Sequence, residues 1–376
     1  QASNGMICSL LELGVDPHQL SEESKNGIEV LDEAAPVGNE NPLAYLGFDD
    51  EILDVGLTPN RNDCMAAWSM ALETGAILHK EVSLPYVEGS ANTGDKSRLI
   101  VQSETEKCPL FLGKVINSVT IKPSPKWMRE LLMAAGMKSI NNVVDISNIV
   151  MLETGQPLHF YDIDAIPAQE ITVKDQQHFD YTALDGETYH ILEDDIVITT
   201  EGKPIGIAGI MGGDDSKIEA TTKGIIIEAA IFNHVAIRNT SRRLNLGTDA
   251  SVRYQKGIEP MATYKAMDRA VQLLVEYADA NGLEETKQYG SNSYTPVEFD
   301  VNLERINILL GTDFQEDEVI KVLDDLHLEP VKNKADIHVK IPSYRMDLAI
   351  EADIAEEIIR ILGYDRLPST MPKMPS

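Results

Sequence analysis

The sequence has 376 residues, 43% hydrophobic and 25% charged, which is typical of a globular protein with roughly two to four domains. Its formal net charge of −29 argues against a general affinity for nucleic-acid backbones, and there is no run of about 18 apolar residues that would predict a membrane span. Three widely spaced cysteines support neither a disulfide framework nor a zinc site, so we expect reduced thiols and a cytoplasmic location.

The first 97 residues contain several short patterns. Residues 1–5 include no initiator methionine and no targeting signal, so we expect an excised fragment. Ile52 to Leu57 alternates like a β-strand. After a turn rich in Asn, Asp63 is placed to cap a helix that runs to about His79. The polar stretch 88–97, rich in Gly and Ser, is typical of a linker.

Residues 98–285 are predicted to form one large domain of mixed α and β structure. Irregular connections separate the strands, with few β-α-β alternations, which favours a multidomain α+β fold over a doubly wound sheet. The predicted strands are Phe111 to Val115, Ile171 to Val173, Ile196 to Thr199 and Gly224 to Glu228, and the predicted helices are Lys126 to Ala135 and Met261 to Tyr277.

Residues 294–376 are predicted to form a third, smaller unit. Glycines close two of its helices, and the order helix, helix, strand, helix is compatible with a winged-helix-like domain. Its acidity and the lack of a basic recognition helix argue against DNA binding. The elements are Asn302 to Leu310, Asp317 to Leu326, Ile337 to Ile341 and Glu351 to Leu362.

Positive charge is concentrated in one stretch of 19 residues, which holds Arg238, Arg242, Arg243, Arg253 and Lys256. An acidic body with one basic segment could hold RNA locally while repelling it elsewhere. The alternative is that these side chains form internal salt bridges.

Four clusters carry polar chemistry: Asn141 to Asn148 with Gly155 to His159, Ala208 to Gly213, Glu228, and Leu246 to Ser251. Each also has a structural interpretation, as a tight turn, a paired carboxylate or a core histidine. The glycine-rich stretch matches neither the Rossmann nor the Walker pattern. Spacing alone does not show that the clusters meet.

A fifth cluster is acidic. Asp353, Glu356 and Glu357 are at positions i, i+3 and i+4 of one predicted helix, so their carboxylates share a face, and Asp347 precedes them. Hard oxygen ligands suit Mg²⁺. By pattern alone, a solvated acidic face is the favoured alternative.

Seven short strings, taken in order, resemble the β subunit of bacterial phenylalanyl-tRNA synthetases over essentially the whole chain. They are Thr58 to Cys64, Asn141 to Asp145, Gly155 to His159, Gly209 to Gly213, Thr248 to Ser251, Ser343 to Asp347 and Ile361 to Tyr364.

The resemblance implies a layout: the tail of an OB-type tRNA-binding domain (1–45), part of the B1 domain (46–88), a linker (89–97), the B3/B4 editing domain (98–285) and the B5 domain (294–376). It implies an α₂β₂ assembly with an α subunit, tRNA(Phe) as partner, and ATP used by the intact enzyme but not bound by this fragment. It also implies a magnesium ion, shared with the α subunit, at Asp347, Asp353, Glu356 and Glu357.

The family hydrolyses tyrosine wrongly attached to tRNA(Phe), and the resemblance implies where that site falls. Its residues map onto Lys138, Ser147, Asn148, His159, the loop Gly209 to Gly213 including Gly212, Glu228, Thr248 and Ala250, with Arg242, Arg243 and Arg253 as RNA contacts. Lys138 stands where some relatives carry Arg, which puts a bidentate contact there in doubt. The alternative is a non-catalytic scaffold that positions tRNA and the α subunit.

We expect Glu228 to accept the tyrosine hydroxyl, because a site built to bond that group rejects phenylalanine. His159 and Asn148 would hold the ester or a water, and Thr248 and Ala250 would shape the wall. A histidine near its ordinary pKa could act as general base. With no Ser-His-Asp or Cys-His set evident, we expect attack by water without a covalent intermediate.

Overall fold

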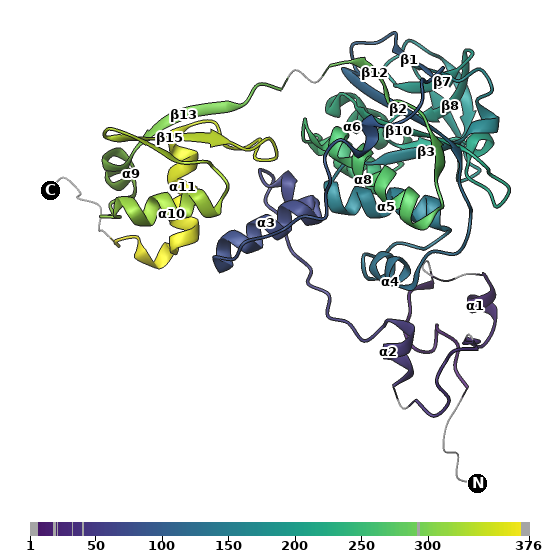
Figure 1. The fold of residues 1–376 in the computed structure, drawn as a ribbon, viewed down its shortest axis with the longest axis horizontal. Coiled ribbons are helices and arrows are strands. Elements are labelled where there is room, and N and C mark those ends of the chain that lie inside the picture. The colour runs from purple at the N-terminus through teal and green to yellow at the C-terminus, as the bar shows by residue number, and fades with distance from the viewer. Residues whose placement is uncertain are drawn as a thin grey trace.

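The computed structural model describes residues 7–17, 20, 22–31, 33–39, 41–291 and 294–369. Residues 1–5, on which the expectation of an excised fragment rests, lie outside these ranges, as do residues 370–376 of the predicted last unit. A large body of sheets and helices and a smaller C-terminal unit lie on either side of helix α3 (Figure 1). Among the described residues, no helix is long and apolar enough to cross a membrane.

The large body is built around an antiparallel central sheet. Its strands are β2 (Leu110–Ser118), β3 (Leu158–Asp162), β10 (Ile225–Ile231), β11 (Asn281–Leu283) and β12 (Lys287–Gly290). Strand β10 lies between β2 and β3, and β11 and β12 both pair with β2. Strand β10 is therefore hydrogen-bonded along both edges, which fits its run of apolar residues.

A second sheet packs against one face of the central sheet. It has the order β1 (Ile100–Ser103), β4 (Glu170–Lys174), β7 (Val197–Thr200), β8 (Lys203–Ile207) and β9 (Met211–Gly212), and only the β1–β4 pairing is parallel. A hairpin of β5 (Phe179–Thr182) and β6 (Thr188–Ile191) extends this layer.

Helices cover the other face of the central sheet. They are α4 (Lys126–Ala134), α5 (Asn142–Thr154) and α8 (Ala262–Tyr277), and α6 (His234–Leu244) and α7 (Asp249–Lys256) lie between β10 and α8 in the chain. Asn141 caps α5 by accepting from the Val143 and Val144 amides, and Gly155 closes the helix at φ +77°. These caps explain why the helix begins and ends there.

Alternation along β10 explains where its one carboxylate points. Ile225 and Ile227 belong to the core shared with the helices, whereas Ile226 and Ala230 belong to the core between the two sheets. Successive strand residues face opposite sides, so Glu228 faces the second sheet. The strand is buried on both faces, which is why its sequence is a nearly unbroken apolar run.

Over residues 294–369, the C-terminal unit has three strands and three helices. They are β13 (Val297–Asn302), α9 (Leu303–Leu310), α10 (Glu316–Asp325), β14 (Val331–Asn333), β15 (Asp336–Ile341) and α11 (Glu351–Leu362). The three predicted helices and the strand β15 are confirmed, with ends shifted by at most one residue. Strands β13 and β14, which pair with β15, were not predicted.

Three expectations for the N-terminal part need revision. Ile52 to Leu57 is not a strand: Ile52, Leu53 and Val55 are 68%, 86% and 54% exposed, so the alternating side chains have no surface against which to pack. Asp63 is not a helix cap: it lies in a 3₁₀ turn (Asn62–Met65) and pairs with Arg61, and helix α3 (Ala67–Leu78) begins after it.

The third is the polar segment 88–97, which is packed and not a loose linker. The amides of Gly89 and Ala91 donate to the buried Asp268 carboxylate of α8, at 2.8 and 2.6 Å. The Ala91 carbonyl in turn accepts from the buried Lys114 ammonium at 2.9 Å. A short 3₁₀ turn (Ser90–Asn92) fixes the segment there.

The remaining elements are short. They are α1 (Glu22–Asn26), α2 (Pro42–Leu46) and the 3₁₀ turns Ile163–Ala165, Asp214–Ser216 and Tyr364–Arg366. Helices α1 and α2 lie beside α4, below the large body in the view of Figure 1. The Lys126 ammonium lies over the Tyr45 ring of α2, 4.9 Å from its centroid.

Candidate functional site

A cavity that is open to solvent, with about 440 Å³ of empty space including its mouth, lies between the two sheets. Strands β3 and β10 supply its polar wall, the segment around β8 and β9 supplies the opposite wall, and α7 closes one side. Its lining is Pro157, Leu158, His159, Tyr161, Ile198, Gly206, Ile207, Ala208, Gly209, Ile210, Met211, Gly212, Glu228, Ala250 and Tyr254. The fold therefore brings together five residues expected at the editing site: His159, Gly209, Gly212, Glu228 and Ala250.

Glu228 is the carboxylate of this cavity. It lies opposite His159 in the register of β10 and β3, and it is 5% exposed. Burial raises the pKa of Glu228 to about 7, although the hydrogen bond donated by the Tyr161 hydroxyl opposes that rise. Near neutral pH the carboxyl is thus present in both protonation states.

His159 is neutral and has an unused ring nitrogen. Burial lowers its pKa to about 4. Its Nε2 is buried and has no hydrogen-bond partner among the described residues, and its ring meets Tyr161 edge-on with centroids 4.4 Å apart. The possibility of a general base near its ordinary pKa therefore does not describe His159, because desolvation disfavours the imidazolium.

The glycines of the loop allow close packing beside these groups. A Cβ on Gly212 would lie 2.7 Å from His159 Nε2 and closer still to the ring carbon Cε1. A Cβ on Gly213 would overlap the Tyr181 hydroxyl. Gly209 has φ +65°, and a Cβ added there would lie 2.9 Å from the Tyr254 ring. The loop backbone can approach His159 and the cavity only without side chains.

Other residues expected at the site lie elsewhere. Thr248 caps α7 and donates from Oγ1 to the Ile210 carbonyl at 2.9 Å, so it anchors the loop from behind. Ser147 donates to the Val144 carbonyl within its own helix at 2.7 Å. Ser147, Asn148, Lys138 and Gly213 are not among the residues that line the cavity, and Lys138 is exposed.

Two tyrosines of the cavity lining were missed from the sequence. Tyr161 follows His159 by two positions on β3, and that period-2 spacing was an available signal that both face the cavity. Tyr254 follows Ala250 by four positions on α7 and is likewise on the same helical face. Its hydroxyl donates to the Ala230 carbonyl at 3.1 Å.

The arginines expected to contact RNA are mostly engaged within the protein. Arg243 pairs with Asp195 and donates to the His190 carbonyl at 2.9 Å. Arg253 is 8% exposed and donates to the Asp249 carbonyl at 3.0 Å. Arg242 is exposed. The alternative of internal pairing therefore describes Arg243 and Arg253 better than a free basic surface does.

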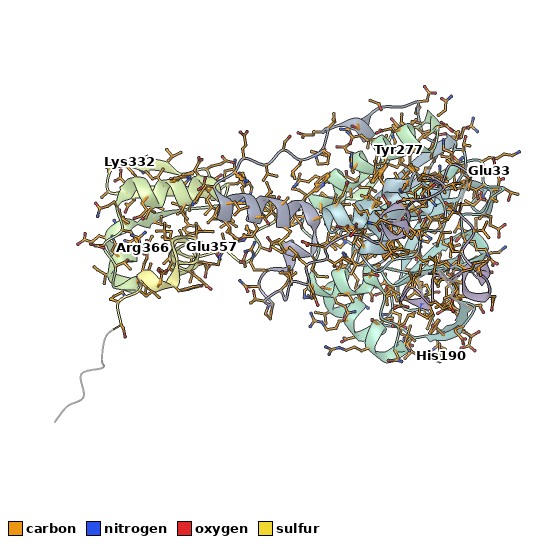
Figure 2. All side chains as sticks on the ribbon, turned by 90° about the horizontal axis from the view of Figure 1, so that it is seen from below. Glu33, His190, Tyr277, Lys332, Glu357 and Arg366 are labelled. Carbon is orange, nitrogen blue, oxygen red and sulfur yellow. The ribbon has the colours of Figure 1, made fainter. Side chains whose placement is uncertain are left out.

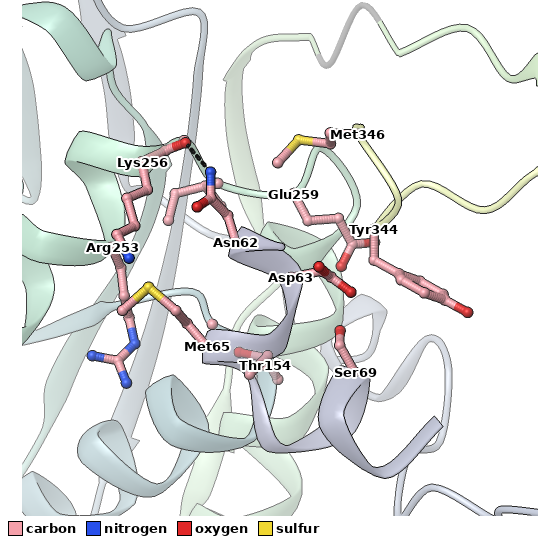
Figure 3. Close-up of a pocket in the computed structure, with 14 residues that line it drawn as sticks. Asn62, Asp63, Met65, Ser69, Thr154, Arg253, Lys256, Glu259, Tyr344 and Met346 are labelled. Carbon is pink, nitrogen blue, oxygen red and sulfur yellow. Dashed lines mark hydrogen bonds between the residues drawn. The ribbon is translucent and has the colours of Figure 1, made fainter. Parts of the chain in front are cut away.

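Arg253 lines a second cavity, of about 400 Å³, at the junction of the large body, α3 and the C-terminal unit (Figure 3). There the Asn62 side chain donates to the Lys256 carbonyl at 2.9 Å, and Tyr344 approaches from the C-terminal unit. Helix α7 thus contributes Ala250 and Tyr254 to one cavity and Arg253 to the other.

The four acidic residues expected to hold magnesium do not form one ligand set. Asp353 accepts from the Ala349 and Ile350 amides at 2.8 and 2.9 Å and so caps α11. Glu357 and Asp347 are paired with Arg345, and Glu356 is exposed. In the described ranges no group of three or more His, Cys, Asp or Glu side chains is arranged to hold a metal ion. The arrangement does not fit the expected ion, and the magnesium site stays a prediction.

Arginines form ion pairs with two of these carboxylates, Asp347 and Glu357. Arg345 is 3% exposed and contacts Asp347 at 2.9 Å and Glu357 at 2.5 Å. Arg360 joins Glu357 to Glu73 of α3. Glu357 lies on the side of the C-terminal unit that faces α3 (Figure 2). These pairs hold the pKa of Glu357 well below its usual range, at about 2, despite burial.

Further ion pairs and a hydrogen bond connect these residues to the N-terminal segment, so that the contacts form a closed ring. Arg61 contacts Glu73 at 2.8 Å and Asp63 at 2.9 Å, and the neighbouring Asn60 donates to Asp347 at 3.3 Å. We call this set the junction ring: Asn60, Arg61, Asp63, Glu73, Asp347, Arg345, Glu357 and Arg360. It joins α3 to the C-terminal unit, whose core also includes Ala76 of α3.

Comparison with known proteins finds two domain families in the chain. Residues 107–279 match the family described as "B3/4 domain", and residues 299–364 match "tRNA synthetase B5 domain". Both cavity walls and the cavity glycines lie in the first match.

Relatives with a common name are similar over 99% of the chain. A protein named "Phenylalanine--tRNA ligase beta subunit" from Geobacillus kaustophilus is 40% identical over 378 residues, which is 46% of its length. One of the same name from Staphylococcus aureus is 39% identical over 47% of its length. A crystal structure of an N-terminal fragment of the phenylalanyl-tRNA synthetase beta-subunit from Pyrococcus horikoshii is 16% identical, with a TM-score of 0.45, over 86% of this chain and 93% of that one.

Proposed function

We propose that this chain, which belongs to the phenylalanine--tRNA ligase beta-subunit family, carries the site that hydrolyses tyrosine from wrongly charged tRNA(Phe). The chain spans about half the length of the curated relatives it matches. The observation that carries the proposal is the Glu228 carboxylate, which faces a cavity beside the unpartnered His159 Nε2.

The cavity chemistry explains a preference for tyrosine. A buried carboxylate bonded to a phenolic hydroxyl gains a charge-assisted hydrogen bond, which is stronger than a neutral one. Phenylalanine would leave the second Glu228 oxygen, the one not bonded to Tyr161, without a donor, and such sites reject the analogue strongly. The surrounding apolar side chains, such as Ile198 and Met211, would contact the ring.

Hydrolysis requires only water and a positioned ester. The water oxygen bonds to the ester carbonyl carbon, the bond from that carbon to the ribose oxygen breaks, and the ribose oxygen takes one proton from the water while the other leaves with solvent. His159, held neutral, would accept a hydrogen bond from the attacking water once a shift of the loop at Gly212 uncovers its Nε2. Its low pKa makes it a weak base, so we assign it to positioning the water, which alone can accelerate such a step substantially.

We also propose that this chain acts within a larger enzyme. The β subunit would pair with an α subunit in an α₂β₂ enzyme that joins phenylalanine to tRNA(Phe) with ATP. This chain would then remove the errors of that reaction. Any magnesium ion of the assembly would need ligands beyond the four carboxylates described above, because arginines already neutralise two of them.

The test is deacylation of Tyr-tRNA(Phe) and Phe-tRNA(Phe) by the chain. Selective release of tyrosine, lost in Glu228→Ala and kept in Glu187→Ala, is expected. Glu187 is an exposed carboxylate on the β5–β6 turn, so it controls for charge alone. If the folded chain releases neither amino acid, even when supplied with the rest of the assembly, the proposal is wrong and a scaffold role replaces it.

A further inference from the structure

We propose that Tyr161 is a positioning residue of the editing site: its phenol holds one oxygen of the Glu228 carboxylate, so that the other oxygen faces the cavity and takes the substrate hydroxyl. This inference rests on the proposed function. It adds a residue that the family resemblance did not assign.

The strand geometry places Tyr161 beside Glu228. Tyr161 and His159 are two apart on β3 and share a face, while Glu228 lies opposite His159 and Ile226 lies opposite Tyr161. Tyr161 is therefore the diagonal neighbour of Glu228, a separation that a tyrosine side chain can span. Its hydroxyl donates to Glu228 Oε2.

The second carboxylate oxygen is left for a ligand. Glu228 Oε1 has no hydrogen-bond partner among the described residues, yet it is not one of the fully covered unpartnered atoms, and Glu228 lines the cavity. A phenol entering the cavity can therefore donate to Oε1 while Tyr161 keeps Oε2, since each carboxylate oxygen accepts independently.

Tyr161 also supports the charge that makes the bond selective. Burial favours the neutral acid at Glu228, and the Tyr161 hydrogen bond favours the carboxylate. The other titratable groups around it supply no positive charge. His159 is neutral, and burial together with Glu228 itself raises the pKa of Cys108 and of Tyr254, so both stay protonated.

Removing the Tyr161 hydroxyl should therefore shift the pH at which the selectivity for tyrosine rises, and not only reduce that selectivity. Without its donor the Glu228 carboxyl stays protonated to a higher pH. A hydrogen bond to a charged group corresponds to a shift of about one to two pH units. A purely structural role for Tyr161 would lower release of both amino acids and leave this midpoint in place.

The experiment compares Tyr161→Phe with Tyr181→Phe. Tyr181 is a matched control, because its hydroxyl is buried without a hydrogen-bond partner in the described part of the chain and it does not line the cavity. The ratio of tyrosine to phenylalanine release is measured against pH. In Tyr161→Phe the rise of this ratio should move upward by about one to two pH units, with about a tenfold loss near neutral pH that recovers in alkali. Tyr181→Phe should follow the wild type.

The outcomes separate the two proposals. No selectivity in the wild type defeats the editing function itself. Selectivity in the wild type with an unchanged profile in Tyr161→Phe defeats the inference, and so does a gain in selectivity, which would mean that Tyr161 competes with the substrate for Glu228.

A second readout needs neither tRNA nor activity. The infrared band of the protonated Glu228 carboxyl, assigned by its loss in Glu228→Gln, should persist to higher pH in Tyr161→Phe than in the wild type. If Tyr161→Phe does not fold, the wild-type band is used: tyrosinamide should lower the pH at which it disappears, whereas phenylalaninamide should not. An equal effect of the two amides overturns the inference.

Discussion

Two glycines on the walls of one cavity should respond oppositely to alanine. A Cβ on Gly212 would lie 2.7 Å from His159 Nε2, on a ring buried between Tyr161 and the loop, so the ring or the backbone must shift. At Gly206 the nearest atoms, the Met211 carbonyl oxygen and the Gly212 Cα, are 3.5 and 3.6 Å away, which is ordinary contact. Neither glycine has a positive φ, so backbone strain does not separate them.

The expected magnitudes follow from packing. Overfilling a well-packed site costs about 1–3 kcal/mol, while replacing glycine by alanine at a compatible position stabilises by about 0.4–1 kcal/mol through the unfolded chain. Gly212→Ala should therefore lower the free energy of unfolding of the large body by up to about 2.5 kcal/mol, and Gly206→Ala should leave it unchanged or slightly higher.

Urea unfolding followed by tryptophan fluorescence and far-ultraviolet circular dichroism would measure both variants. The His159 ring signals in an NMR spectrum report whether the ring moves, and they should shift far more in Gly212→Ala than in Gly206→Ala. Equal destabilisation by the two substitutions would refute the argument that the loop glycines exist to let the backbone approach His159.

Three further predictions concern buried charge. Burial raises the pKa of Glu228 in the folded state from 4.5 to about 7, so its contribution to the free energy of unfolding is full below pH 4.5 and is lost as pH rises through 7. The free energy of unfolding of Glu228→Gln should therefore rise by about 3 kcal/mol relative to that of the wild type between about pH 4.5 and pH 8. Parallel curves of stability against pH, measured by urea unfolding, would contradict this prediction. Arg345→Met removes the Arg345 ion pairs of the buried Glu357 and the partly buried Asp347, although Arg360 still pairs with Glu357, so urea titration should show a loss of up to about 3–5 kcal/mol in the free energy of unfolding. Arg305→Met breaks the exposed pair with Glu351 and should change the stability little. Similar losses in both variants would count against the junction ring as a stabilising unit. EDTA should leave the thermal unfolding of the chain unchanged, and a clear rise in Tm with Mg²⁺ would restore the expectation of a bound ion.

Prediction from the sequence was most successful where a single hydrophobic periodicity determines whether a segment is a helix or a strand. The apolar stripe of α8 and the apolar run of β10 each indicate which side chains are buried, without knowledge of the rest of the fold. The orientation of Glu228 then follows from strand alternation. What spacing could not supply was the second sheet, which Glu228 and His159 face, because strands far apart in the chain build that cavity.

Failures occurred where tertiary contacts override a local pattern. Ile52 to Leu57 alternates correctly for a strand but has no neighbouring strand in the described structure. The sequence left open that His159 could act as a general base near its ordinary pKa, and only its burial between Tyr161 and Gly212 argues against that role.

The acidic cluster shows the same limit from another side. Asp347 is two residues from Arg345, and Glu357 is three from Arg360, so local arginine partners were visible in the sequence. The ion pair between Arg360 and Glu73 was not visible in the sequence, because the two residues are 287 positions apart. Helical spacing therefore grouped these carboxylates but did not reveal their separate environments, in which Asp353 caps α11, Glu356 is exposed and Glu357 pairs with arginines.

The most direct test of a Glu228 site for tyrosine is binding of two non-hydrolysable analogues, adenosine carrying tyrosine or phenylalanine through a 3′-amide. With a charge-assisted hydrogen bond to Glu228, the tyrosyl analogue should bind about 10- to 100-fold more tightly, and this preference should vanish in Glu228→Gln measured above pH 7. Equal binding of the two analogues by the wild type, or a preference for tyrosine that Glu228→Gln retains, would contradict the account.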